Sequence, residues 1–203
     1  MKIAVYGATG MVGSQIVAEA ARRGHEVTAL SRKGTAVEGA AVVRAADLAD
    51  LETYRSVAEA HDAVVLATSP DRTGGPREPY FEAHRAIAEV PTEARLYLVA
   101  GFGNLQGPDG TRIKDLPDFP AEYKAESDAV LAAYEALRDS DASLDVTAHA
   151  PAAVIQPGER TGKYTTAVGV PAGDFISAQD YAVAAIDELE KPQFQGKIFT
   201  AAN

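Results

Sequence analysis

The chain has 203 residues, of which 46% are hydrophobic and 24% charged, enough apolar material for the core of a globular domain. Its formal net charge of −10 repels phosphate backbones and anionic lipid surfaces, so nucleic-acid and membrane partners are disfavoured. Because the chain has no cysteine, disulfides and thiolate zinc sites are excluded.

Apolar segments of strand length alternate along the chain with amphipathic segments of helix length, as in a parallel sheet whose strands are joined by crossover helices. This pattern predicts an α/β fold of the Rossmann type, a doubly wound and mostly parallel sheet with helices on both faces, in one domain over residues 1–203. The predicted strands are Lys2 to Tyr6, Glu26 to Leu30, Ala41 to Arg44, Ala63 to Ala67, Arg95 to Ala100, Leu144 to Ala148 and Lys197 to Thr200. The predicted helices are Met11 to Arg23, Asp50 to Ala60, Pro79 to Val90, Pro120 to Arg138 and Ala178 to Glu190.

We expect no signal peptide, because the first apolar segment begins directly after Met1. No apolar run reaches the roughly 18 to 20 residues that a membrane-spanning helix needs. The sequence therefore predicts a cytoplasmic protein that binds a small molecule, and we expect a monomer or a homodimer.

A glycine-rich turn, Gly-Ala-Thr-Gly-Met-Val-Gly at residues 7–13, joins the first predicted strand to the first helix. This strand-turn-helix context distinguishes a dinucleotide-binding turn from a chance pattern. Gly7 permits the tight turn, Gly10 lets the backbone approach a diphosphate, and Gly13 lets the helix pack closely on the sheet. The residues expected to hold the diphosphate, at the positive end of the helix dipole, are Gly7, Thr9, Gly10, Met11, Val12 and Gly13. The alternative is a glycine-rich turn without a ligand.

The residues after the second predicted strand bear on the choice of cofactor. Enzymes that prefer NAD carry an Asp or Glu there, about 20 residues after the glycine turn, which accepts hydrogen bonds from the ribose hydroxyls. This chain has Ser31, Arg32 and Lys33 instead, and their positive charge suits the 2′-phosphate of NADP. The sequence thus favours NADP(H) over NAD(H), with a solvated basic turn as the alternative.

Two further groups of residues are candidates for cofactor contacts. After the third predicted strand, Asp47 is placed to accept from the adenine amino group while Leu48 packs against the ring, although Asp47 is equally suited to a turn before a helix. Ala67, Thr68 and Ser69 end the fourth strand, where small residues let the backbone pass close to the ribose and nicotinamide. These three residues also fit an ordinary turn.

Three long segments follow the carboxyl ends of predicted strands, the edge at which open α/β sheets bind ligands. They are Thr68 to Glu78, Gly101 to Phe119 and His149 to Lys163. We expect these loops to contact the substrate.

Residues 7–14 (Gly-Ala-Thr-Gly-Met-Val-Gly-Ser), 22–30 (Arg-Arg-Gly-His-Glu-Val-Thr-Ala-Leu) and 156–164 (Gln-Pro-Gly-Glu-Arg-Thr-Gly-Lys-Tyr) resemble an atypical short-chain dehydrogenase/reductase. More narrowly, the chain resembles the NmrA-like group described as NADH-flavin reductases, with relatives of the biliverdin reductase B type. The resemblance implies a Rossmann domain with a small C-terminal elaboration, NAD(P)H as reductant, and a flavin, quinone or similar flat acceptor over the nicotinamide. It also implies that Gly101 and Pro151 lie near the nicotinamide.

The catalytic candidates are Asn104 and His149. Asn104 matches the position of a serine in the flavin-reductase-like group, and it can hydrogen-bond an acceptor but is a poor proton donor, so an ordinary loop role is the alternative. His149 is expected at the carboxyl end of the sixth strand, where strand alternation either exposes it or turns it into the core. The remaining histidines are expected to be structural and are His25, His61 and His84.

No tyrosine has a lysine four residues later, the pair with which other members of the superfamily protonate a carbonyl oxygen. A flavin or quinone delocalises the charge that a hydride brings and can take its proton from solvent, whereas a ketone needs an acid. The sequence therefore predicts an NAD(P)H-dependent oxidoreductase that prefers NADPH and reduces a flavin, a quinone or a similar conjugated acceptor.

Two other functions use a similar nucleotide-binding domain. A non-catalytic NADP(H)-binding redox sensor of the NmrA-like type remains the alternative, whereas a sugar-nucleotide epimerase is disfavoured because such enzymes generally keep the Tyr/Lys pair. The chain has no clustered histidines and no Gly-x-Ser-x-Gly segment, so we expect neither a metal site nor a hydrolase.

Overall fold

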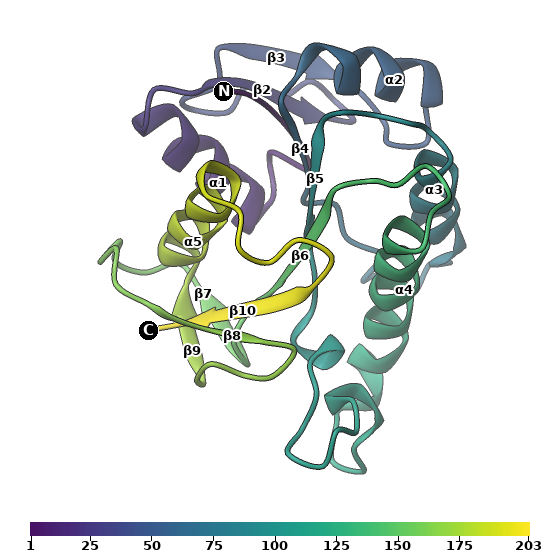
Figure 1. Ribbon diagram of the computed structural model, residues 1–203, viewed down its shortest axis with the longest axis vertical. Helices are drawn as coiled ribbons and strands as arrows, with labels where there is room; N and C mark the ends of the chain where they lie inside the picture. Colours follow the sequence, from purple (N-terminus) through teal and green to yellow (C-terminus); the bar gives the residue numbers. More distant parts are fainter.

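Eight strands form one continuous sheet across the computed structural model, which describes residues 1–203 (Figure 1). Their order is β3-β2-β1-β4-β5-β6-β10-β8, and every neighbouring pair is parallel except β10 and β8. The strands are β1 (Lys2–Tyr6), β2 (Glu26–Ser31), β3 (Val42–Ala45), β4 (Ala63–Leu66), β5 (Arg95–Val99), β6 (Val146–Ala150), β8 (Thr165–Val168) and β10 (Ile198–Ala202). This sheet confirms the predicted Rossmann-type α/β fold.

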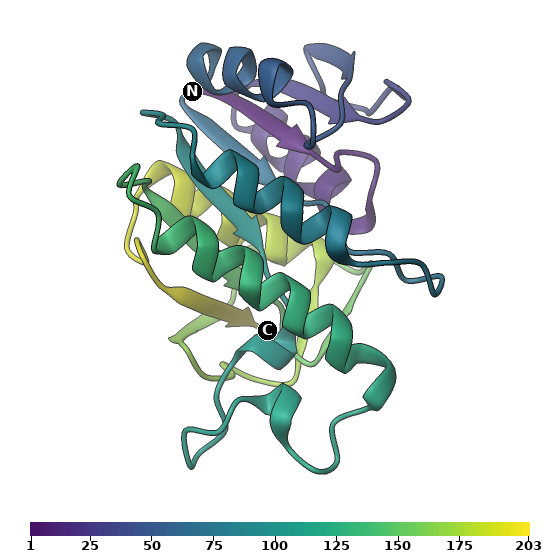
Figure 2. The same ribbon diagram turned by 90° about the vertical axis from the view of Figure 1, so that its right-hand side faces the viewer.

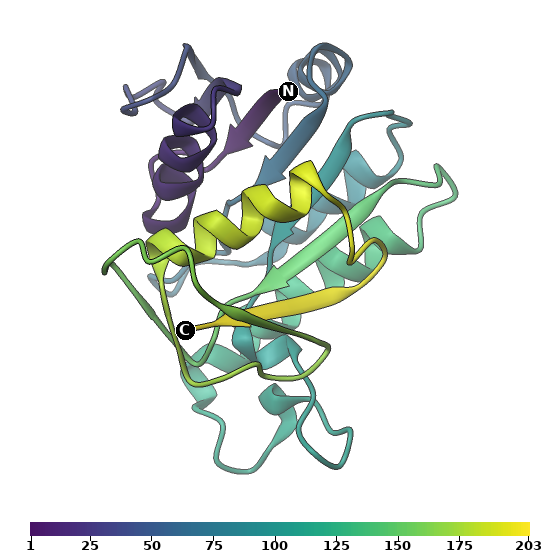
Figure 3. The same ribbon diagram turned by 60° about the vertical axis from the view of Figure 1, so that its left-hand side comes forward.

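Five helices cover the two faces of the sheet. The helices are α1 (Met11–Arg22), α2 (Leu51–Ala60), α3 (Glu78–Ala88), α4 (Ala121–Arg138) and α5 (Ala178–Glu190). α1 and α5 lie side by side on one face (Figure 3), and α2, α3 and α4 cover the other (Figure 2). Two 3-10 turns, η1 (Phe102–Asn104) and η2 (Ile113–Asp115), lie between β5 and α4. None of the helices combines the length and the apolar composition that crossing a membrane requires.

The alternation of side chains along β1 explains why both faces carry a core. Ile3 and Val5 belong to the buried cluster under α1 and α5, whereas Ala4 and Tyr6 belong to the cluster under α2, α3 and α4. Tyr6 is the last residue of β1, and its ring centroid lies 6.4 Å from that of Tyr54 on α2. The aromatic ring of Tyr6 is therefore placed at the carboxyl edge of the sheet.

The structure differs from the expectations in its C-terminal third. Three short strands had no predicted counterpart: β8, and the pair β7 (Val154–Gln156) and β9 (Phe175–Ser177), which form a separate parallel sheet. These strands have three or four residues each, too few to show a hydrophobic periodicity. The sixth strand begins two residues later than predicted, at Val146, so His149 lies inside β6 and the predicted loop from His149 to Lys163 includes β7.

Residues 156–164, which we call the clamp, are fastened to α1 and α5. The Arg160 guanidinium donates two hydrogen bonds of 2.8 Å to the carboxylate of Glu19 on α1. The side chain of Glu19 is only 2% exposed and also accepts from Arg23 at 2.8 Å. A buried carboxylate is thus neutralised by arginines from two parts of the chain.

A second buried carboxylate that binds the clamp is that of Asp180 on α5. It accepts from the Thr161 hydroxyl at 2.5 Å, the Gly162 amide at 2.7 Å and the Asn203 side chain at 2.6 Å. Asp180 is fully buried, and these donors satisfy its oxygens. The clamp therefore joins both helices of one face to the end of the chain.

Candidate functional site

A cleft of about 680 Å³ runs along the carboxyl edge of the sheet. The chain leaves β1 toward β2 and β3 on one side and reaches β4 on the other, and such a reversal of strand order is where open α/β sheets bind ligands. The structure brings many of the predicted cofactor residues together in this cleft. Those that line it are Gly7, Thr9, Gly10, Ser31, Arg32, Asp47, Leu48, Ala67, Thr68 and Ser69.

The glycine turn packs so closely that two of its positions have no room for a side chain. Gly7 has φ +75°, and a Cβ there would lie 2.3 Å from the carbonyl oxygen of Ala67 at the end of β4. A Cβ on Gly13 would lie 2.2 Å from the carbonyl oxygen of Gly7. The first turn of α1 is therefore held directly against the ends of β1 and β4.

The first turn of α1 also presents unpaired donors. Its N-cap is Gly10, which has no capping side chain, and the backbone amides of Met11, Val12 and Gly13 have no acceptor within the protein. Free amides at the positive end of a helix dipole form a binding site for anions. Met11, Val12 and Gly13 themselves lie outside the cleft lining, which reaches the helix at its N-cap, Gly10.

Four polar side-chain atoms of the cleft lining are buried without a hydrogen-bond partner. They are the hydroxyls of Tyr6, Thr68 and Tyr80 and Nε2 of His84. Buried polar atoms are normally satisfied by protein, water or ligand, because leaving them unpaired costs free energy. Burial raises the pKa of Tyr6 to about 12, so its hydroxyl keeps its proton near neutral pH. These atoms fit a ligand that offers both donors and acceptors.

Of the candidate residues at the ends of β2 and β3, all but Lys33 line the cleft. Arg32 is exposed and lines the cleft directly after Ser31, whereas Lys33 lies outside the lining. One carboxylate oxygen of Asp47 accepts from the Ala49 amide at 3.0 Å, which leaves the other oxygen free. Leu48 is buried, with 5% exposure, and gives the cleft an apolar wall.

The loop after β4 forms one side of the cleft through Asp71 and Arg72. The Asp71 carboxylate accepts from the backbone amides of Thr73 at 2.8 Å and Gly75 at 2.7 Å. Arg72 forms an ion pair of 2.5 Å with Glu126 on α4. The predicted loop from Thr68 to Glu78 is thus ordered by its own hydrogen bonds and attached to α4.

Neither catalytic candidate lines the cleft. Asn104 is 1% exposed; its side-chain oxygen accepts from the Gly101 amide at 3.0 Å, and its side-chain nitrogen donates to the Ser127 carbonyl at 2.7 Å. These bonds hold η1 between β5 and α4. Gly101 and Pro151 lie at the ends of β5 and β6, beside the cleft but outside its lining.

His149 is fully buried under α5. Its ring stacks between Tyr181, at 3.8 Å between centroids, and Phe199, at 4.2 Å, and its Nδ1 lies 2.6 Å from the Tyr97 hydroxyl. Burial lowers its pKa well below the usual value. Strand alternation therefore turns His149 into the core, which was one of the two orientations expected.

The cleft contains residues that sequence reasoning did not assign to the site. Tyr80 and His84, one helical turn apart on α3, both line it, as does Tyr6. His84 was expected to be structural, since a histidine inside a helix does not reveal which strand ends it faces. The sequence feature that could have assigned Tyr80 and His84 to the cleft is their position in the helix that directly follows the loop after β4.

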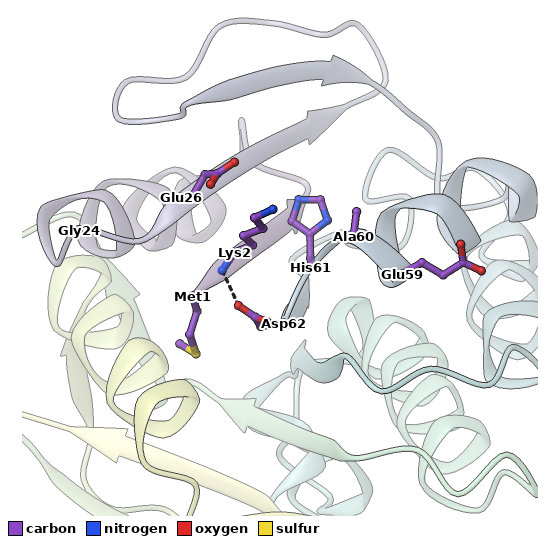
Figure 4. Close-up of a pocket in the computed structure, with 8 residues that line it drawn as sticks. All are labelled: Met1, Lys2, Gly24, Glu26, Glu59, Ala60, His61 and Asp62. Carbon is purple, nitrogen blue, oxygen red and sulfur yellow. Dashed lines mark hydrogen bonds between the residues drawn. The ribbon is translucent and has the colours of Figure 1, made fainter.

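A second hollow, of about 450 Å³, lies at the opposite edge of the sheet, where the strands begin (Figure 4). The Lys2 amide donates to the Asp62 carboxylate there at 2.7 Å. His61 is bonded through both ring nitrogens, to the Val57 carbonyl at 2.7 Å and the Thr28 hydroxyl at 2.8 Å. No side chain of this hollow has a buried polar atom without a partner, so it lacks the feature that marks the cleft.

Comparison with known proteins places this cleft in context. Residues 7–192 match the model of a protein family described as NAD(P)H-binding. The uncharacterized protein YwnB of Bacillus subtilis is 36% identical over 219 aligned positions, which cover 100% of this chain and 99% of YwnB.

Two crystal structures are similar over the whole chain. One, from Streptococcus pneumoniae and provisionally assigned as an NADH-flavin reductase, has 31% identity and a TM-score of 0.85, covering 100% of this chain and 99% of that one. The other, from Burkholderia pseudomallei and provisionally assigned as an exported protein, has 38% identity and a TM-score of 0.82, covering 100% of both chains.

Proposed function

The chain belongs to the NAD(P)H-binding family, and from this premise we propose that it is an NADPH-preferring reductase that transfers hydride to a flavin, a quinone or a similar conjugated acceptor. The observation that supports it best is the cleft at the carboxyl edge, where unpaired amides of α1 adjoin buried polar atoms without partners. A dinucleotide offers phosphates to the amides and a base and riboses to the polar atoms. We also propose that the protein acts in the cytoplasm.

In this proposal the cofactor's diphosphate binds the amides of Met11, Val12 and Gly13, and the 2′-phosphate binds beside Ser31 and Arg32. Guanidinium groups bind phosphates in bidentate fashion, which supports NADPH over NADH. The adenine lies against Leu48 with Asp47 at its amino group. When bound, the dihydronicotinamide supplies the hydride.

The nicotinamide is proposed to lie at the β4 end of the cleft, near Thr68, Gly101 and Pro151. The loops that follow β4, β5 and β6 adjoin this end and are proposed to hold the acceptor. The protein's contribution is then orientation and proximity rather than proton transfer.

The choice of a conjugated acceptor is supported by the lack of an evident acid. No tyrosine has a lysine four residues later, and Tyr123 of α4 is 56% exposed. Asn104 and His149 are engaged in the interior. A flavin or quinone can take its proton from solvent, so neither side chain is assigned a proton.

The same observation favours a second candidate, a redox sensor that binds NADP(H) without consuming it. Such a protein needs a cofactor cleft but no catalytic acid. The two functions differ in whether bound NADPH is oxidised when an acceptor is added.

The test is to mix the purified protein with NADPH or NADH and, in turn, FMN, FAD, a quinone and a simple ketone, and to follow the loss of reduced nicotinamide by absorbance. We expect oxidation with a flavin or quinone, faster from NADPH than from NADH. Turnover of ketones alone would overturn the proposed acceptor class. Tight binding of NADPH without oxidation by any acceptor would instead support the sensor.

A further inference from the structure

His84 of α3 has a fixed tautomer. Its Nδ1 lies 2.7 Å from the carbonyl oxygen of Tyr80, one helical turn earlier. A carbonyl oxygen can only accept a hydrogen bond, so Nδ1 must carry the proton and Nε2 must be a bare acceptor. The Tyr80 ring packs against the imidazole, with 4.1 Å between centroids, and holds it in this orientation.

This acceptor is buried and has no donor. His84 is 0% exposed, and Nε2 has no partner in the protein, although the residue lines the cleft. Burial lowers the pKa of His84 to about 4, so the ring stays neutral and Nε2 remains an acceptor near pH 7. An unpaired buried acceptor destabilises the protein unless something in the cleft donates to it.

The surroundings of His84 suit a flat ring with an amino group. Leu48 and Ala83 give the cleft apolar walls, and the free carboxylate oxygen of Asp47 is a second acceptor in the same lining. Nearby, the unpartnered hydroxyls of Tyr6 and Tyr80 can donate to ring nitrogens. Adenine matches this set, because it has one exocyclic amino group with two protons and several ring nitrogens that accept.

We propose that His84 Nε2 accepts a hydrogen bond from the exocyclic amino group of the cofactor's adenine, so that the cleft selects an amino-purine over an oxo-purine dinucleotide. This inference rests on the cofactor binding proposed above, but not on the acceptor or on turnover. It gives His84 the role of a specificity-determining residue.

The chain offers a matched control in His61. Its Nδ1 also lies 2.7 Å from the carbonyl oxygen four residues earlier, that of Val57. Its Nε2, however, already meets the Thr28 hydroxyl, and it lies at the opposite edge of the sheet. Replacing His61 by Phe therefore removes the same local hydrogen bond, together with the bond to Thr28, at a residue that does not line the cleft.

The experiment compares binding of NADPH with that of its hypoxanthine analogue, in which a carbonyl oxygen replaces the amino group, by titration calorimetry. We expect the intact protein to bind the analogue about tenfold more weakly, the loss expected for one buried hydrogen bond. His84→Phe should reduce this preference by about fivefold, whereas His61→Phe should leave it within about twofold of the original. His84→Gln, whose side-chain oxygen can accept, should restore part of the preference.

Equal binding of the two dinucleotides by the intact protein would overturn the inference, whether or not the variants fold. An unchanged preference in a folded His84→Phe variant would also overturn it. If neither dinucleotide binds, the proposed cofactor fails and this inference fails with it. If NADPH is preferred through His84 but no acceptor is reduced, the inference stands and only the proposed reductase activity fails.

Discussion

Buried polar groups have hydrogen-bond partners beside the clamp and lack them in the cleft. Glu19 and Asp180, the carboxylates to which the clamp binds, accept hydrogen bonds from arginines, backbone amides and other side chains at 2.5 to 2.8 Å. In the cleft, the hydroxyls of Tyr6 and Tyr80 and Nε2 of His84 have no hydrogen-bond partner. Unpaired buried groups cost free energy, and four of the nine such side-chain atoms line this one cleft, where a ligand can complete them, whereas none belongs to the clamp, Glu19 or Asp180.

The clamp, which is the segment most typical of the family resemblance, lies apart from the cleft. Residues 156–163 were expected to belong to a loop that contacts substrate. The Arg160 side chain bonds to α1, the Thr161 side chain to α5 and the Lys163 carbonyl to Asn203, and no residue of this stretch lines the cleft. We infer that this part of the loop stabilises the fold, and that contacts with the acceptor come from the residues nearer the strand ends.

The largest expected effect comes from breaking the clamp. Glu19→Gln keeps the shape of the side chain but removes the only carboxylate paired with Arg160, whereas Arg23 keeps Asp187 and Glu190. Removing one partner of a buried ion pair costs about 3 kcal/mol, reduced here because Arg160 is partly exposed. We expect the free energy of unfolding in urea to fall by about 2 kcal/mol, with NADPH affinity unchanged within about twofold.

The control for this change is Glu38→Gln, which removes a carboxylate from an exposed loop residue. It should leave the free energy of unfolding within about 0.5 kcal/mol of the original. A loss of NADPH affinity in folded Glu19→Gln would contradict the division of roles between clamp and cleft.

The same carboxylate predicts a pH dependence of stability. Burial alone raises the pKa of Glu19, but hydrogen bonds from Arg160 and Arg23 outweigh it and lower the pKa to about 2 from the ordinary 4.5. A group whose pKa is lowered on folding stabilises the protein above its unfolded pKa, and this contribution is lost as pH falls toward the folded value. The stability gap between the original protein and Glu19→Gln should be constant above about pH 5.

Below that pH the gap should narrow, to less than half by about pH 3. Urea unfolding of both proteins at several pH values measures it. A gap that stays constant through the acid range would show that the charge of Glu19 does not stabilise the clamp.

What could be predicted from the sequence follows the same division. The seven strands and five helices with a hydrophobic pattern were all found, and parallel strands gather their carboxyl ends, so residues such as Asp47 and Thr68 could be assigned to one cleft. The strands β7, β8 and β9 were missed because they have only three or four residues and lie outside any longer apolar run. No periodicity distinguishes such strands from a loop.

The site residues that were missed or misplaced depend on packing between distant elements. His84 reaches the cleft only because α3 crosses the strand ends at a particular rotation, which its sequence does not encode locally. His149 is buried because both faces of β6 are covered: Ala148 and Ala150 face α4, and His149 faces α5. Side-chain direction in a strand has a period of two, so the orientation of an inner residue depends on alternation more than on distance from the strand end.

A change of intermediate size concerns the cofactor end of the cleft. Arg32→Ala removes the guanidinium proposed to bind the 2′-phosphate, so NADPH affinity should fall about tenfold while NADH affinity changes less than about twofold. Titration of both cofactors measures the ratio. Lys33→Ala is the neighbouring control and should have the smaller effect, because Lys33 does not line the cleft. Equal losses for NADPH and NADH would place the 2′-phosphate elsewhere.

The smallest expected effect is the difference in stability between Phe substitutions of two buried tyrosines, one with a hydrogen-bond partner and one without. Tyr181 is fully buried, and its hydroxyl donates to the His149 carbonyl at 2.7 Å, whereas Tyr6 is 1% exposed and its hydroxyl has no partner. Tyr181→Phe removes one of the two donors to the buried His149 carbonyl, which keeps the Ala100 amide, and should lower the free energy of unfolding by about 1 kcal/mol. Tyr6→Phe removes an unsatisfied group, so stability without cofactor should stay within about 0.5 kcal/mol or rise.

If the cleft hydroxyls bind the ligand, Tyr6→Phe should lower the stabilisation that added NADPH brings, measured as the cofactor-dependent shift in thermal unfolding. Equal losses from the two substitutions without cofactor would mean that the Tyr6 hydroxyl has a partner in the folded protein, and the contrast between cleft and clamp would fail at that residue.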